Sequence, residues 1–239
     1  MQKKKKLISM LLVIVMVMAL CPVTANAAGS NYRVGGKMQL GSYEQDDNNA
    51  NGEEPITWRI LDKKGGKVLL LSDKCLDVQP YDTSDYGVTW EDSEIREWLN
   101  EEFLYDAFSK SEISYIVEVE NENPKNPSGT NGGDNTDDMI FLLSVNECQE
   151  YLKTNSDRQA VPTDYAEGLG VDNEHKEPYC RWWLRTPGAS TENATNVHAA
   201  GGINFNGKDN GTEDIAVRPA LWFDVTNYTS SSTLNVEMK

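Results

Sequence analysis

The sequence has 239 residues, with 38 acidic and 22 basic side chains and a formal net charge of −16. This charge argues against a nucleic-acid partner, because proteins that hold a phosphate backbone depend on clusters of basic side chains. Two histidines cannot build a multi-histidine metal centre, and the four cysteines include no C-x-x-C pair of the kind that binds zinc.

The first 27 residues have the layout of a secretory signal peptide. Four lysines at residues 3–6 precede an apolar run over residues 7–21, and Ala25-Asn26-Ala27 supplies the small residues of a cleavage site. The apolar run is shorter than the roughly 20 residues that a bilayer span needs, and Pro22 follows it directly. We therefore expect cleavage after Ala27, no stable membrane insertion afterwards, and a secreted or surface-associated product.

Cleavage makes the remaining chain more acidic. It removes four lysines and no acid, so 18 basic groups (22 − 4) face 38 acidic ones and the net charge becomes −20. The remaining 212 residues (239 − 27) fit one large domain, which we expect over residues 28–226 with a flexible tail at residues 227–239. Six tryptophans and ten tyrosines are ample for a core, so the acidity is assigned to the surface.

The first predicted elements are strands. Met38 and Leu40 alternate with polar residues in a short strand that ends before Gly41. Residues 56–61 and 68–72 then form a hairpin around a glycine-rich turn, and the second run is apolar enough for a buried strand.

Four short helices follow. Their signals are an apolar i, i+3, i+4 spacing after Asp92, capping boxes at Ser109 and Ser144, and a pattern over residues 163–169. Strand character returns at residues 180–185, 195–206 and 215–225. Strands at both ends with helices between them predict an α+β fold with mixed or antiparallel strands.

A long polar stretch at residues 121–138 is crowded with Asn, Pro, Gly and Asp, as functional or disordered loops are. Asp134, Asn135, Asp137 and Asp138 within it supply the hard oxygen ligands that calcium prefers, so they are a candidate calcium site. A solvated acidic loop is the alternative. Residues 47–52 match the first half of a calcium-loop pattern, but Trp58 stands where that pattern requires a bidentate glutamate.

Three cysteines remain after cleavage, namely Cys75, Cys148 and Cys180. In an oxidising compartment this odd number allows one disulfide with a spare thiol, or three buried unpaired thiols. The spacing does not decide between the two. Cys148 falls on the apolar face of the helix predicted after Ser144, so we expect it in the core.

Two motifs carry a family resemblance. Residues 182–188 read WWLRTPG and residues 217–222 read VRPALW. Earlier in the chain, and in the same order, come GSY at 41–43, ITWRIL at 56–61, QPY at 79–81, WE at 90–91, IREWLN at 95–100 and FLLS at 141–144. Over roughly residues 36–224 the chain resembles the DUF6273 group of uncharacterised bacterial extracellular domains. That resemblance implies no particular biochemical activity.

The closing part of the chain is also similar to C-type-lectin-like domains, including their formylglycine-generating branch. The similarity consists of a Trp-containing strand with an arginine, an Asn- and Gly-rich stretch, and a strand that opens on a hydrophobic-Arg pair. It implies a C-type-lectin-like α+β fold with a ligand face between the two motifs. The catalytic cysteines of the formylglycine-generating branch have no matching motif here, so its activity is not implied.

The motif side chains have two interpretations each. Arg185 and Arg218 lie in apolar strands, where an unpaired guanidinium is costly, so we expect pairing with a carboxylate or with backbone carbonyls that clamps the fold. Contact with a ligand is the alternative. Trp182 and Trp183 point to opposite faces of one strand, so we expect one in the core and the other partly exposed.

Residues 189–214, between the two motifs, contain little that could form a core. Short amides offer both donors and acceptors, which suit sugar hydroxyls or a polar protein epitope, and loops on a rigid scaffold often carry recognition. A solvated hairpin loop is the alternative. The candidate ligand-binding residues are Asn193, Asn196, His198, Asn204, Asn206, Lys208 and Asn210.

We therefore expect an exported recognition module for a polar extracellular glycan or protein, with calcium as the only cofactor considered and no catalytic residue assigned. The alternative is a secreted glycosidase-type hydrolase that places two carboxylates across a sugar. Glu91 and Asp92, beside Trp90, are the least arbitrary pair for that chemistry, although Asp92 is also a candidate helix cap. The oligomeric state is not predicted.

Overall fold

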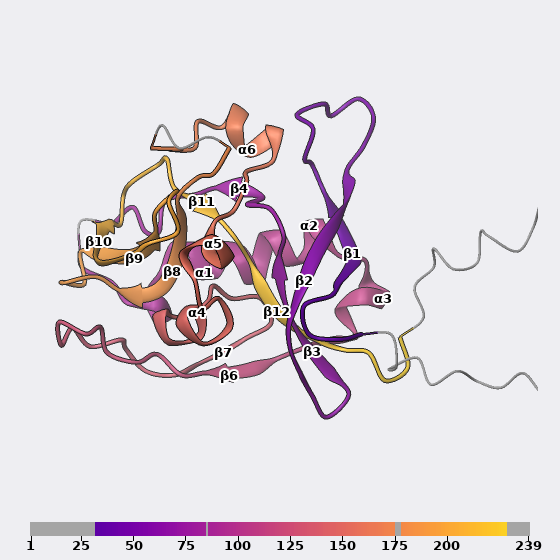
Figure 1. The fold of residues 1–239 in the computed structure, drawn as a ribbon, viewed down its shortest axis with the longest axis horizontal. Coiled ribbons are helices and arrows are strands. Elements are labelled where there is room, and N and C mark those ends of the chain that lie inside the picture. Colours follow the sequence, from indigo (N-terminus) through magenta and orange to yellow (C-terminus); the bar gives the residue numbers. More distant parts are fainter. Residues whose placement is uncertain (1–31, 85, 175–177, 229–239) are drawn as a thin grey trace, which may run out of the picture.

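A computed structural model describes residues 32–84, 86–174 and 178–228 of the chain (Figure 1). The predicted signal peptide at residues 1–27 lies outside the described residues, as does the predicted tail from residue 229 onward. None of the helices in the described ranges is long and apolar enough to cross a membrane.

The first sheet is antiparallel and has five strands in the order β1-β2-β3-β12-β5. Gly65 and Gly66 form the two-residue turn between its second and third strands, both at positive φ, as a tight hairpin requires. The predicted hairpin is therefore confirmed. The strands are β1 (Lys37–Tyr43), β2 (Glu54–Lys64), β3 (Lys67–Ser72), β12 (Ala220–Asp224) and β5 (Ile116–Val117).

The second sheet has the order β10-β9-β8-β11-β4. Its central strand β8 runs antiparallel to β9 and parallel to β11, so this sheet is mixed. Its strands are β10 (Ile203–Asp209), β9 (Asn193–Val197), β8 (Trp182–Pro187), β11 (Ala216–Val217) and β4 (Asp77–Val78). A separate antiparallel pair, β6 (Val119–Asn121) and β7 (Thr136–Asp138), brackets the long polar stretch predicted as a loop.

The chain passes directly from one sheet to the other at two places, from β3 to β4 and from β11 to β12, and it crosses again through the helical segments between β4 and β5 and between β5 and β8 (Figure 1). One continuous cluster of buried side chains fills the interior and draws on both sheets, with Trp58 and Phe223 from the first and Trp182 and Leu184 from the second. Antiparallel and mixed sheets with interspersed short helices make this an α+β protein, as predicted.

The helical segments are short, and several are defined by their caps. Ser109 and Ser144 each form the predicted capping box with the glutamate three residues later, and Thr154 forms a third with Asp157. The helix predicted after Asp92 runs from residue 94 to residue 107 with a π-helical turn in its middle. The segments are η2 (Trp90–Asp92), α1 (Glu94–Trp98), η3 (Leu99–Phe103), α2 (Leu104–Ala107), α3 (Lys110–Ile113), α4 (Val145–Tyr151), α5 (Asn155–Arg158) and α6 (Asp164–Gly168).

Candidate functional site

The Asn- and Gly-rich segment forms the β9–β10 hairpin at one edge of the second sheet. Strand β9 is buried from Ala194 to Val197, whereas much of β10 is exposed. Asn196 is 0 % exposed, and neither its side-chain oxygen nor its nitrogen has a hydrogen-bond partner. The structure therefore places this predicted ligand-binding amide in the interior, beneath the sheet edge.

The other predicted amides of the hairpin are held locally or lie open. Asn193 donates to the Ser190 hydroxyl over 3.0 Å, and Asn204 donates to the carbonyl of Gly207 over 3.0 Å. Asn206 is exposed and Lys208 half-buried. These contacts stabilise turns in the hairpin, so the segment does not present its amides as one uniform face.

His198 belongs to a separate group of polar and ionisable side chains. Its Nδ1 atom lies 3.0 Å from Oε1 of Glu174, whose other oxygen accepts a hydrogen bond from the Ala199 N–H over 2.8 Å. The same carboxylate pairs with Arg181. Burial raises the pKa of Glu174, but the donors on Arg181, Ala199 and His198 outweigh it and lower the pKa to about 2.

Asn210 contributes to a different feature, a polar pocket of about 310 Å³ where Thr83, Ser84 and Tyr86 meet the end of β10. Its backbone carbonyl accepts hydrogen bonds from the N–H groups of Tyr81 and Asp82, over 2.9 and 3.1 Å, which joins the two segments. The pocket is lined by Thr83, Ser84, Tyr86, Glu192, Asp209, Asn210 and Gly211.

The side chain of Asn210 is buried and only half satisfied. Its Nδ2 atom donates to the carbonyl of Thr191 over 2.9 Å, while its Oδ1 atom has no hydrogen-bond partner. At the same pocket the ring of Tyr86 is 81 % exposed. The exposed Tyr86 and the buried Asn210 thus line one polar pocket, and the unpaired Oδ1 atom of Asn210 is enclosed by protein atoms.

Sequence reasoning missed the pocket residues outside the Asn-rich segment. The available signal was Tyr86, a large aromatic residue within a polar, turn-rich stretch that offers no periodic core for it. The turn itself is fixed by Asp82, whose Oδ1 atom accepts from the N–H and hydroxyl of Ser84 and whose Oδ2 atom accepts from the N–H of Glu94. These hydrogen bonds fix one side of the pocket to the first residue of α1.

Arg185 is buried and connects three segments. Its guanidinium donates to the carbonyls of Leu142 and Glu122 over 2.8 and 3.0 Å, and to the Asn123 side-chain oxygen over 3.2 Å. It also forms an ion pair with Glu147, in the first turn of α4. The partners are both carboxylate and carbonyl, and they join β8 to α4 and to the start of the long polar stretch.

Arg218 is completely buried and donates to backbone carbonyls instead. Its Nε atom donates to Ser72 over 3.0 Å, and its terminal nitrogens donate to Arg158 and Asp73 over 3.4 Å each. In the part of the chain that the structure describes, no carboxylate forms an ion pair with it. Burial lowers the pKa of its guanidinium.

Both motif tryptophans are buried, so the expectation that one of them is partly exposed is wrong. Trp182 donates from Nε1 to the carbonyl of Arg158 over 3.0 Å. Trp183, on the opposite face of β8, donates to the carbonyl of Gln79 over 2.9 Å and packs edge-on against Tyr81 with ring centroids 5.7 Å apart. The segment after β4 covers that second face.

The structure does not bring the four predicted calcium ligands together. Asp138 is buried, and its carboxylate accepts from Trp90, Asn121, Thr136 and Arg96 at 2.6–2.9 Å, which saturates it with protein donors. Asp137 is exposed and lines a groove elsewhere.

The other two members of that set serve local contacts. The Asp134 carbonyl accepts from the side chain of Asn123 over 2.7 Å, and Asn135 donates to Glu120 over 3.1 Å. Asp138 and Asn135 therefore have structural partners of their own, and the polar stretch is held to its neighbours by these bonds.

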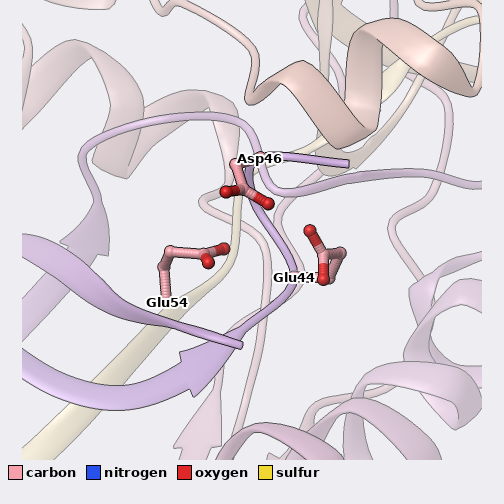
Figure 2. A group of neighbouring side chains, drawn as sticks. All are labelled: Glu44, Asp46 and Glu54. Atoms are coloured by element: carbon pink, nitrogen blue, oxygen red, sulfur yellow. The ribbon is translucent and has the colours of Figure 1, made fainter. Parts of the chain in front are cut away.

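Among the described residues, the carboxylates that do converge are Glu44, Asp46 and Glu54, which each place an oxygen within 4.8 Å of the others. Figure 2 shows the three turned toward a common space between the end of β1 and the start of β2. Each also accepts a hydrogen bond from the connecting loop, from Asn48, Asn51 and Gln45 respectively. The group offers the hard oxygen atoms that a divalent cation prefers.

The predicted glycosidase pair lies at a larger groove of about 530 Å³. Glu91 and Asp92 line it together with Glu97, Glu101 and other acidic side chains. Trp90, however, is fully buried and donates to Asp138 over 2.9 Å, so its ring does not face this groove. Trp90, the residue that suggested Glu91 and Asp92 as a sugar-binding pair, therefore does not line the groove.

The comparisons with known proteins concern the region that carries these sites. The model of the DUF6273 family, described as a domain of unknown function, matches residues 65–225, more than half of the chain. No curated protein and no solved structure matches. The matched range includes both sequence motifs, the contacts of Arg185 and Arg218, and the polar pocket at Asn210. The chain therefore belongs to the DUF6273 family.

Proposed function

We propose that the chain is an exported recognition module that binds a glycan at the polar pocket around Asn210. The observation that carries this proposal is that one pocket joins the exposed side chain of Tyr86 to the polar residues Asn210, Glu192 and Asp209. Pockets that join a few polar groups to an aromatic surface are the usual form of small-ligand sites.

The acceptors at the pocket support a ligand rich in hydroxyl groups. A sugar hydroxyl is a donor of suitable size for an amide or carboxylate oxygen. Glu192 and Asp209 line the same pocket and add carboxylate acceptors. Acceptors outnumber donors in this set, which matches the many O–H donors of a carbohydrate.

The ring of Tyr86 supports the same class of ligand. An aromatic face carries partial negative charge, and the C–H groups on one face of a sugar ring carry partial positive charge, so the two stack. At 81 % exposure the Tyr86 ring is open to such a contact. A protein epitope is the competing ligand, and an array without glycan hits would favour it.

The C-type-lectin-like resemblance belongs to this proposal and remains a prediction. It implies a ligand face between the two motifs, and four of the seven pocket-lining residues, Glu192, Asp209, Asn210 and Gly211, come from that stretch of sequence. Of the amides predicted from sequence, Asn210 is the one at the pocket.

The experiment is a glycan array of bacterial cell-wall fragments and neutral oligosaccharides, followed by calorimetry on the bound structures. Tyr86→Ala is expected to weaken binding by roughly two- to tenfold, the size of one lost stacking contact. Tyr105→Ala is the matched control, because that ring is 66 % exposed but lies on the acidic groove. Equal affinities for the two variants, or an array without hits, would overturn the proposal.

Export is tested separately. When the full chain is expressed in a bacterial host, mass spectrometry of the protein in the medium or at the cell surface is expected to find an N-terminus at Ala28. A chain retained inside the cell with its first 27 residues would contradict export. It would not contradict glycan binding, which the array tests separately.

A hydrolase is the second candidate, and one observation favours keeping it. Glu192 and Asp209 line the same pocket, so a glycan bound there would meet two carboxylates, the set that glycosidases use. Turnover would release reducing ends from an oligosaccharide and would be lost in Glu192→Gln or Asp209→Asn. A binding module instead releases none, and these variants lower its affinity only.

A further inference from the structure

Two of the three described cysteines lie in contact. Cys75 and Cys180 are both 0 % exposed, and their thiols lie near enough to act on each other, while the Cys180 thiol donates to the carbonyl of Ala160 over 3.6 Å. All three described cysteines are free thiols in the structure. Cys148 is also buried, but the side chains that act on its thiol are Arg158, Arg218 and Glu147, not a second thiol.

Backbone hydrogen bonds fix the positions of the two thiols. Cys75, on the crossing from β3 to β4, donates from its N–H to the carbonyl of Val161 over 3.0 Å and accepts from the Thr163 N–H over 2.9 Å. Cys180, two residues before β8, donates to the carbonyl of Ala160 over 3.0 Å. The segment of residues 160–163 thus binds both cysteines, which are far apart in the sequence.

We propose that Cys75 and Cys180 form a disulfide when the chain folds under oxidising conditions, and that Cys148 remains a thiol. The pairing rests on the direct contact of the two thiols and on their shared backbone anchor. It selects one pairing from the alternatives that the sequence left open.

Glutathione disulfide is a sufficient oxidant for this step. The thiolate of one cysteine attacks a sulfur of glutathione disulfide, which forms a mixed disulfide and releases one glutathione thiolate. The thiolate of the second cysteine then attacks the cysteine sulfur of the mixed disulfide and releases the second glutathione. The protein loses two thiol protons and two electrons, and the electrons reduce glutathione disulfide to two molecules of glutathione.

The timing of the reaction follows from the environment. The contact with Cys75, together with burial, raises the pKa of the Cys180 thiol, and only a thiolate is an effective nucleophile. Oxidation of the folded protein is therefore slow, because the raised pKa keeps the Cys180 thiol protonated and neither sulfur is accessible. The bond is expected to form while the chain folds, before the core closes over the two sulfurs.

The disulfide would join the crossing between the two sheets to the central strand of the second sheet. Because it would close a loop from residue 75 to residue 180, its removal lowers the stability of the chain through the unfolded state. A protein whose disulfide has been reduced is expected to melt on the order of 10 °C below the oxidised protein.

The experiment is refolding of the full chain in a buffer of reduced and oxidised glutathione, alkylation in denaturant, and peptide mapping by mass spectrometry. We expect a linked pair of peptides containing Cys75 and Cys180, with alkylated Cys148. Cys148→Ser is the matched control and should keep the link, whereas Cys75→Ser should leave Cys180 alkylated.

The mapping also reads out chains that fail to reach the native fold, because linked and alkylated peptides are identified in denaturant. Alkylation of both Cys75 and Cys180 in the refolded wild-type chain, or a link that includes Cys148, would overturn the proposal.

Discussion

The guanidinium of Arg218 lies over the indole ring of Trp182, with its Cζ atom 5.0 Å from the ring centroid. Both side chains also donate to the carbonyl of Arg158, Trp182 over 3.0 Å and Arg218 over 3.4 Å. The two sequence motifs thus meet at one carbonyl in the core. Trp182 of the first motif and Arg218 of the second are therefore in direct contact, so the two motifs stabilise the same part of the core.

Replacement of Arg218 by lysine should be strongly destabilising. A lysine keeps the charge but cannot reproduce the planar fork that donates to Ser72, Asp73 and Arg158, so carbonyls and a buried charge lose partners. We expect Arg218→Lys to lower the free energy of unfolding by about 3 kcal/mol or more, measured by urea denaturation. Arg33→Lys, at an exposed position, is the control. Equal midpoints for the two variants would contradict a clamp role.

Asn196 should be dispensable for stability, unlike its neighbour in the same strand. Its amide is fully buried without a partner, so Asn196→Val removes a desolvation penalty and is expected to stabilise the protein by about 1 kcal/mol. Thr195 donates to the carbonyl of Thr186 over 2.7 Å, so Thr195→Val should destabilise by a similar amount. Thermal denaturation of both variants gives the comparison. A destabilised Asn196→Val would show that the amide has a partner in solution, such as a buried water.

Local features of the fold follow from the sequence. Ser109 and Ser144 cap helices as predicted, because a capping box depends on a residue only three positions away. The β2–β3 hairpin is similarly local, since Gly65 and Gly66 set its register. The helix expected at residues 163–169 is present as α6.

Features that depend on distant contacts did not follow from the sequence. Trp183 is buried because Gln79 and Tyr81, more than a hundred residues earlier, cover it. Asp138 is an internal acceptor because Trp90 and Arg96 reach it from another segment. The same holds for the candidate site: the sequence identified Asn210 by its residue type, but its pocket is also formed by Thr83, Ser84 and Tyr86 from a distant segment.

The stability of the chain should fall in acid through Glu174. Its pKa is about 2 in the folded protein against an ordinary value of 4.5, so the unfolded chain binds more protons between these pH values. The contribution is complete above about pH 5 and is lost as the pH falls toward 2. For this partly exposed group we expect about 1–2 kcal/mol after allowing for solvent screening.

Urea denaturation at a series of pH values measures this effect. Glu174→Gln should flatten the acid limb of the curve, because the glutamine does not titrate. Glu213→Gln, at an exposed position, is the control and should keep the wild-type slope. Parallel curves for wild type and Glu174→Gln would show that the ion pair with Arg181 contributes nothing in solution.

We expect calcium to stabilise the protein at Glu44, Asp46 and Glu54, and not at the residues 134–138 predicted from the sequence, since these three carboxylates converge. Neutralising their mutual repulsion favours the folded loop, and at ten times the dissociation constant the expected gain is about 1.4 kcal/mol, or roughly 3–6 °C in melting temperature. Melts in excess calcium and in chelator measure the shift. Glu54→Gln should abolish most of it, whereas Asp137→Asn should leave it intact. An unchanged melt of the wild-type protein excludes calcium as a stabilising ligand of the triad.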